Sequence, residues 1–132
     1  MKVKCKANSG KALTPKYLAL GYTRQTVCHV AIENEYTVFA VAVYREVVLL
    51  LLSDEDALPN WYPVDLFSLS DGRVPEGWLS AIYPGNDDGL QFLMGYPRIV
   101  SDEAHYDALL ERDPAAIEAF RLEKQKSEVS EK

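Results

Sequence analysis

The fold class is decided by residues 36–52, which read YTVFAVAVYREVVLLLL. Valine and aromatic residues fill 36–44 and aliphatic residues fill 47–52, which is typical of strands buried on both faces. Arg45 and Glu46 separate the two runs, so we predict a central hairpin, although its turn lacks the usual glycine or asparagine. A single buried helix is the alternative, but the many β-branched residues disfavour it.

Shorter extended segments lie on both sides of this hairpin. Lys2, Lys4 and Lys6 alternate with apolar residues, which predicts an edge strand with its lysines on one face. Residues 7–25 are expected to form a long ordered loop. Further strands are expected at 26–32, 64–69, 78–83 and 90–96, the last two joined by a turn-forming run at 84–89. About six short strands in series predict a mainly β (α+β) fold, a small SH3-like or partly open antiparallel β-barrel.

The C-terminal part of the chain has helical signals. Ser101 is suited to cap a helix, and the acidic residues that follow it favour the helix dipole. Asp113 and Pro114 repeat this start signal. We therefore predict two C-terminal helices, at about 101–112 and 114–126, within one domain over 1–126 that is followed by a polar tail at 127–132.

Composition and charge restrict the class of protein further. Hydrophobic residues make up 48% and charged residues 26% of the 132 residues, which excludes a disordered or collagen-like chain. The net charge of −6 is uneven, because residues 1–32 hold six bases and no acid while the remainder holds 20 acids against eight bases. Such an acidic body would repel a phosphate backbone, so we expect a basic protein partner rather than nucleic acid.

Signals of secretion, membrane insertion and catalysis are missing from the sequence. The longest aliphatic run, 47–52, is far too short for a spanning helix, and Cys5 and Cys28 are more typical of reduced cytosolic thiols than of a disulfide. Glycine-rich phosphate loops, nucleophile elbows and paired histidine ligands are absent. We expect a cytoplasmic protein that is no enzyme and uses no metal or cofactor; a small enzyme using Cys28 or His105 is the alternative.

Two acidic loops are the candidate binding residues. One of them precedes a tryptophan in a polar loop, and an aromatic side chain flanked by carboxylates is a good anchor for a basic partner. Neither loop has the spaced ligands and central glycine of a calcium site. We predict that partner binding uses Asp54, Glu55, Asp56 and Trp61, with Asp87 and Asp88 as a second contact loop. The basic N-terminal residues with Tyr17 and Tyr22 between them leave single-strand nucleic-acid binding as an alternative.

One ordered set of residues resembles a known group of proteins. The set comprises Glu35-Tyr36-Thr37-Val38-Phe39, Trp61-Tyr62-Pro63 with Leu66-Phe67, Asp71-Gly72-Arg73 and Trp78, followed by His105-Tyr106-Asp107. It resembles small bacterial proteins of SH3-like-barrel appearance that are similar to the immunity proteins of polymorphic or contact-dependent toxin systems. The resemblance implies a cytosolic protein that binds and neutralises one cognate toxin domain, such as a basic nuclease. The alternative is a small-barrel binding module for peptide or RNA.

Overall fold

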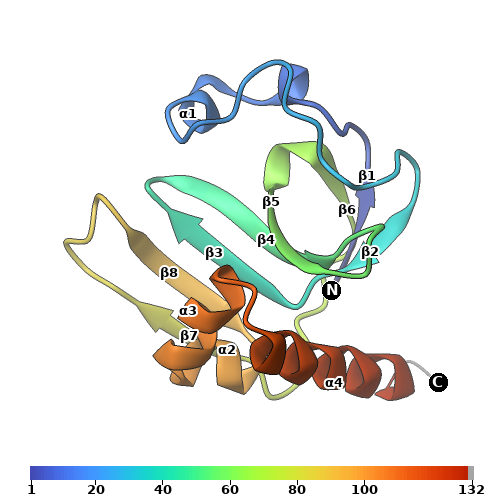
Figure 1. Ribbon diagram of the computed structural model, residues 1–132, viewed down its shortest axis with the longest axis vertical. Helices are drawn as coiled ribbons and strands as arrows, with labels where there is room; N and C mark the ends of the chain where they lie inside the picture. Colours follow the sequence, from blue (N-terminus) through green and yellow to red (C-terminus); the bar gives the residue numbers. More distant parts are fainter. Residues whose placement is uncertain (131–132) are drawn as a thin grey trace.

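The strands of the protein form two antiparallel sheets in the computed structural model, which describes residues 1–130 (Figure 1). The larger sheet has the order β5 (Pro59–Pro63), β4 (Val47–Ser53), β3 (Ala40–Tyr44), β8 (Leu90–Gly95) and β7 (Leu79–Ile82). The smaller sheet has the order β2 (Glu35–Thr37), β1 (Lys2–Cys5) and β6 (Phe67–Asp71). The prediction of a mainly β fold with helices is confirmed.

The predicted central hairpin is formed by β3 and β4, where Tyr44 pairs with Val47. Arg45 and Glu46 both have positive φ, 48° and 69°, which is how the tight turn forms without glycine. The predicted strand 36–44 is nevertheless divided between the two sheets. The backbone N–H of Val38 donates to Met1 and that of Phe39 donates to Leu51, so the chain changes sheets between these two residues.

The two sheets are also joined through β5, which continues through a 3-10 turn, η2 (Val64–Leu66), into β6. Within residues 1–130 the strands do not close into a barrel, because β5 and β7 end one ladder and β2 and β6 end the other. The SH3-like barrel is therefore not confirmed. The prediction of an N-terminal edge strand is wrong, since β1 lies in the middle of the smaller sheet, between β2 and β6.

The N-terminal loop region differs from the prediction as well. No strand forms at 26–32; Val27 makes an isolated bridge with Ser9. The loop at 7–25 contains a 3-10 turn, η1 (Gly10–Ala12), and a short helix, α1 (Pro15–Leu18). A Cβ on Gly10 would lie 1.6 Å from the carbonyl oxygen of Thr23, so the two loop segments touch through backbone. The two loop segments are therefore held together by close backbone contacts rather than by the hydrogen bonds of a β-ladder.

The C-terminal helices are α2 (Pro97–Ser101), α3 (Glu103–Leu110) and α4 (Pro114–Ser130), three helices rather than the predicted two. Ser101 ends α2, and Asp102 caps α3 by accepting a hydrogen bond of 3.2 Å from the backbone N–H of His105. The expected polar tail is helical as far as residue 130, and its last two residues, 131–132, lie outside the described residues. No helix within residues 1–130 is long and apolar enough to cross a membrane.

Two apolar clusters form the core, on opposite faces of the larger sheet. Leu50 and Leu52 belong to the cluster shared with the smaller sheet, and Leu51 belongs to the cluster covered by the C-terminal helices. Successive side chains of a strand point to opposite faces, so the aliphatic run of β4 serves both clusters. The predicted burial on both faces is thus found at Leu50–Leu52 of β4, whereas β3 is buried on the face of Ala40 and Ala42 and half-buried on the other. In Figure 1 α2, α3 and α4 lie on one side of the larger sheet, and the smaller sheet lies on the other.

Candidate functional site

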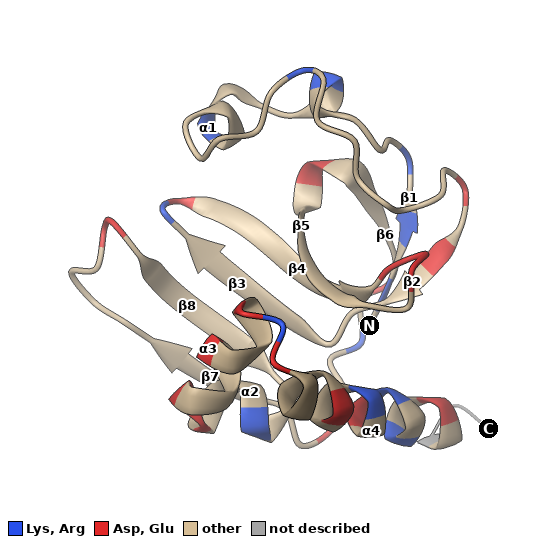
Figure 2. Cartoon of the chain, viewed as in Figure 1, with Lys and Arg blue, Asp and Glu red and all other residues tan. Residues whose placement is uncertain are grey.

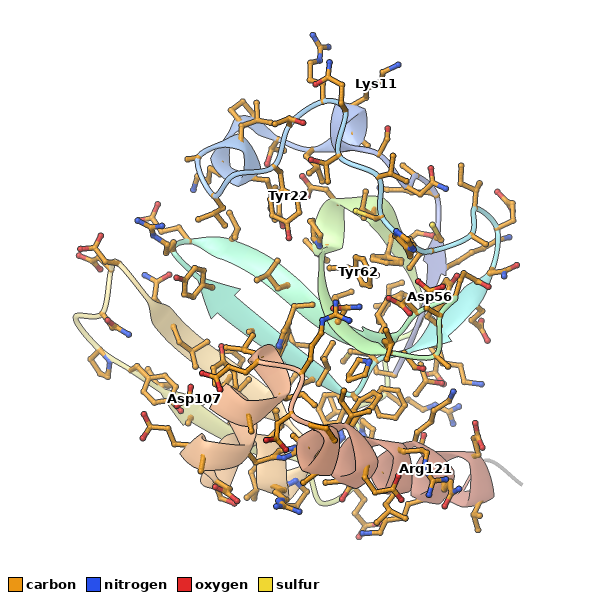
Figure 3. All side chains as sticks on the ribbon, in the orientation of Figure 1. Lys11, Tyr22, Asp56, Tyr62, Asp107 and Arg121 are labelled. Carbon is orange, nitrogen blue, oxygen red and sulfur yellow. The ribbon has the colours of Figure 1, made fainter. Side chains whose placement is uncertain are left out.

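A groove of about 390 Å³ lies between the N-terminal loop and the start of β5. Its lining includes three of the predicted binding residues, Asp54, Asp56 and Trp61, together with Tyr22 of the loop and Arg112 after α3. Tyr22 and Asp56, two of the residues that line the groove, are labelled in Figure 3. Arg112 donates a hydrogen bond of 2.6 Å to Asn60 and so joins the end of α3 to β5.

Asp54 is buried at the end of β4 and is not a surface contact. Its side chain accepts hydrogen bonds from the amides of Asp56 and Leu58, at 2.9 and 3.2 Å, and from Asn60 and Tyr62, at 2.7 and 2.6 Å. Burial alone would raise the pKa of Asp54, but these donors outweigh it and the pKa lies below its usual value. Only 7% of Asp54 is exposed, which disfavours the prediction that it contacts a partner.

The two acids that follow are exposed but have partners within the chain. Glu55 accepts hydrogen bonds from the hydroxyl of Tyr36 and, at 3.1 Å, from Asn34. Asp56 lies 2.8 Å from Nδ1 of His29. More than half of each side chain in the His29–Asp56 pair is accessible to solvent, and such surface pairs contribute little to stability. Both acids remain accessible to a partner, and their role in binding stays a prediction.

Trp61 lines the groove and also lies beside a tyrosine of α3. It is half-buried, and its ring lies 6.1 Å from that of Tyr106 on α3. Burial is the largest of the causes that raise the pKa of Tyr106 to about 12, and Tyr44, Asp107 and Tyr83 make smaller contributions to the same shift. We call Trp61, Tyr106, Tyr44 and Tyr83 the aromatic row. None of its members is fully buried, and Tyr83 is 36% exposed.

The second predicted contact loop, with Asp87 and Asp88, is exposed and joins β7 to β8. The pairing of Tyr44 with Leu90 puts this loop beside the β3–β4 turn. The loop at 54–58 leaves β4 at its other end, after Ser53. The two predicted acidic loops therefore lie at opposite ends of the larger sheet and do not form one cluster.

Three further exposed carboxylates occur in α3 and at its C-terminal end, and the sequence analysis did not single them out as candidates for binding. All three are exposed: Glu103 and Asp107 lie in α3 and Glu111 is its C-cap residue, and their spacing of four residues lines them up in one stripe. Within residues 1–130, neither this stripe nor Asp87 and Asp88 takes part in an ion pair. Figure 2 shows the acids of α3 and of the β7–β8 loop on the same side of the view. The spacing of four residues between these acids is the feature of the sequence from which the stripe could have been predicted.

The basic residues near the N-terminus have acidic neighbours. Lys4 lies 2.9 Å from Glu33, and Lys16 lies 3.6 Å from Glu46. Lys2 likewise lies 3.8 Å from a carboxylate, that of Glu35 on the adjacent strand. These pairs compensate part of the basic charge, which disfavours the alternative of nucleic-acid binding at this end of the chain.

The two thiols and His105 are buried within the fold. Cys5 and Cys28 are buried and free, and burial raises the pKa of both thiols, so each stays protonated near neutral pH. His105 is buried against Tyr96, whose hydroxyl lies 2.8 Å from Nε2. Among residues 1–130, no group of three or more His, Cys, Asp or Glu side chains is arranged to hold a metal ion.

Comparison of the chain with protein-family models, with curated proteins and with solved structures gives no match. Function is therefore inferred from the geometry and charge of the surface described above. The features that bear on it are the aromatic row, the stripe of carboxylates along α3 and the exposed acidic loop between β7 and β8.

Proposed function

We propose that the protein is a cytosolic, non-enzymatic immunity protein that binds and neutralises one basic toxin domain. The binding surface consists of the aromatic row, the stripe of Glu103, Asp107 and Glu111, and the loop that carries Asp87 and Asp88. The observation that carries the proposal is the stripe itself, a set of exposed carboxylates without ion pairs beside half-buried aromatic rings.

The carboxylates of the stripe lower the stability of the free protein. Like charges four residues apart on a helix repel one another, by roughly 0.2–0.5 kcal/mol per pair. Glu111 also lies at the C-terminal end of α3, where the helix dipole disfavours a negative charge. A basic partner would offset both effects on binding, which supports a role for these side chains in association rather than in folding.

Aromatic and charged groups contribute to such an interface in different ways. Tyrosine and tryptophan side chains bury large areas and supply most of the affinity at protein interfaces. Carboxylates around them accelerate encounter with a positively charged partner and orient it. Nuclease active sites bind phosphate and are therefore basic, so an acidic surface can occupy such a site in place of the substrate.

The residues predicted from the sequence fit this surface to different extents. Asp87 and Asp88 lie at one end of the aromatic row, and Trp61 belongs to the row. Asp56 and Glu55 lie beyond Trp61, on the loop that borders the groove, and are proposed as peripheral contacts. Asp54 is excluded because it is buried.

The test is coexpression with the toxin domain encoded by the neighbouring gene. We expect the protein to restore growth and to copurify with the toxin domain. The substitution Asp107→Lys should weaken binding at least about tenfold through charge reversal within the interface. Glu128→Lys is the matched control, since Glu128 is an exposed acid on α4, away from the aromatic row. Failure of the unmodified protein both to protect and to copurify would refute the proposal.

A further inference from the structure

The four edge strands of the two sheets differ in how they are protected against pairing. An exposed edge offers unpaired N–H and C=O groups, and natural proteins usually guard it with charges or prolines. Pro59 and Pro63 bound β5, Glu35 lies in β2, and Asp71 lies in β6. The remaining edge strand, β7, contains only leucine, serine, alanine and isoleucine. Figure 1 shows it at the margin of the larger sheet, beside β8.

The outward backbone groups of β7 follow from its register with β8. The N–H of Tyr83 donates to Gln91 at 2.9 Å, so in this antiparallel pair every second residue of β7 faces β8. Ser80 and Ile82 therefore direct their N–H and C=O groups to the open edge. Within residues 1–130, no other strand or loop hydrogen-bonds to that edge.

The side chains of this strand are unusually exposed for their type. Ile82 is 71% exposed, and Leu79 and the following Tyr83 are 45% and 36% exposed. Because side chains alternate along a strand, Leu79 and Tyr83 lie on one face of the sheet margin and Ile82 lies on the other, so both faces beside the open edge carry exposed apolar side chains. An added strand would cover them while it satisfied the backbone groups of Ser80 and Ile82.

The charges at the two ends of β7 select the partner. Glu76 precedes the strand, and Asp87 and Asp88 follow it, all of them exposed. If two copies of the chain paired through β7 in antiparallel orientation, the 84–89 loop of each would meet Glu76 of the other. Carboxylates would then face carboxylates, which disfavours a second copy and favours a basic segment.

We propose that β7 accepts an extended segment of a partner protein as an added strand, one whose alternating apolar residues are flanked by lysine or arginine. This extends the proposed function, on which it rests for the existence of a protein partner. It adds recognition through the main chain to the side-chain contacts of the aromatic row. The partner's basic flanks would meet Glu76 on one side and Asp87 and Asp88 on the other.

The direct test uses a peptide of about nine residues, the length of a long strand, with alternating valine and threonine and two lysines at each end. We expect it to bind the full chain and to shift the amide resonances of Ser80 and Ile82. A peptide with glutamates in place of the lysines should bind at least about tenfold more weakly. Equal binding of the two peptides, or no shift of the β7 amides, would overturn the proposal.

Two variants of β7 and one control make the test specific. Ser80→Pro removes an outward N–H that makes no bond to β8, and Ile82→Lys adds a guarding charge; each should reduce lysine-peptide binding at least about tenfold. Val129→Lys introduces the same charge on α4, where Val129 is also 71% exposed, and should bind normally. Ile82→Lys keeps the test valid if the proline variant unfolds. Undiminished binding by a folded β7 variant would contradict the proposal, as would dimers with protected β7 amides in the absence of peptide.

The two proposals fail separately. Peptide binding at β7 without any binding of the toxin domain would leave the strand site in place and overturn the proposed function. Binding of the toxin domain that is lost in Asp107→Lys but unchanged in both Ser80→Pro and Ile82→Lys would support the proposed function and overturn strand addition.

Discussion

The carboxylate of Asp54 accepts a hydrogen bond of 2.6 Å from the hydroxyl of Tyr62, and both residues are buried. The bond links the end of β4 to β5 across the loop at 54–58. The negative charge of Asp54 and the burial of the phenol together hold the pKa of Tyr62 far above its usual value. The phenol is therefore protonated and donates this bond near neutral pH.

Removal of this donor should destabilise the fold. We expect Tyr62→Phe to lower the free energy of unfolding by about 1–3 kcal/mol, because a buried carboxylate then loses one of its partners. Asp54→Ala should cost more, since it leaves several donors unpaired. Urea denaturation followed by fluorescence measures both. Asp56→Asn, in the same loop but exposed, should change stability by less than about 0.5 kcal/mol, and a larger loss there would contradict this assignment.

His105 should make stability depend on pH near neutrality. The ring is 3% exposed, and its Nδ1 has no partner within the described residues. Burial lowers the pKa of His105, as does Arg98, although Asp102 and Glu123 oppose the shift. Because the unfolded chain takes up the proton more readily, the contribution of His105 is complete above its usual pKa of 6.5 and declines as the pH falls below it.

Thermal unfolding between about pH 8 and pH 5 tests this dependence. We expect the midpoint to fall with pH in the unmodified protein and to fall less in His105→Gln. Leu110→Gln is the matched control, because Leu110 is exposed on the same helix and carries no titratable group, so the slope should be unchanged. The contribution of Asp54 is separate, since it is present above its usual pKa of 3.8 and is lost only in more acidic solution. An unchanged slope in His105→Gln would contradict the role of His105.

Phe120 should hold α4 against the larger sheet. Its ring lies 4.9 Å from that of Phe39 in an edge-to-face arrangement, and only 2% of the residue is exposed. Phe120→Ala should destabilise the protein by about 3–5 kcal/mol, the usual cost of a cavity of this size. Leu122→Ala is a control on the same helix, since Leu122 is 47% exposed, and should cost less than about 1 kcal/mol. Equal losses in the two variants would show that helix propensity rather than packing anchors α4.

The two thiols should be unreactive in the folded protein. Cys5 is 0% and Cys28 is 6% exposed, and burial raises the pKa of each thiol, which lowers the fraction of reactive thiolate. At pH 8 a thiol reagent should modify both slowly in buffer and rapidly in urea. Rapid modification of Cys28 in buffer would mean that the groove beside it opens more widely than in this structure.

Local patterns predicted much of the secondary structure. The hairpin in 36–52 and the start of α4 at Pro114 are confirmed, because a run of β-branched residues and a capping signal act over neighbouring residues. The side chain of Asp113 does accept a hydrogen bond of 2.9 Å, from the amide of Ala115. The prediction that β1 lies at a sheet edge was wrong, because the strands that flank it come from distant parts of the sequence. The alternation of lysines specifies which face of the strand they occupy, but not where the strand lies in the sheet.

The proposed binding surface depended far more on the tertiary structure. Asp54, Glu55 and Asp56 are chemically alike in the sequence, and only the approach of Tyr62 and Asn60 makes the first of them an internal group. The acidity of the chain and its supply of aromatic residues are properties of the sequence itself. Which carboxylates lie beside which rings was decided when α3 packed on Trp61, because burial of apolar surface between distant segments sets the positions of the charges around it.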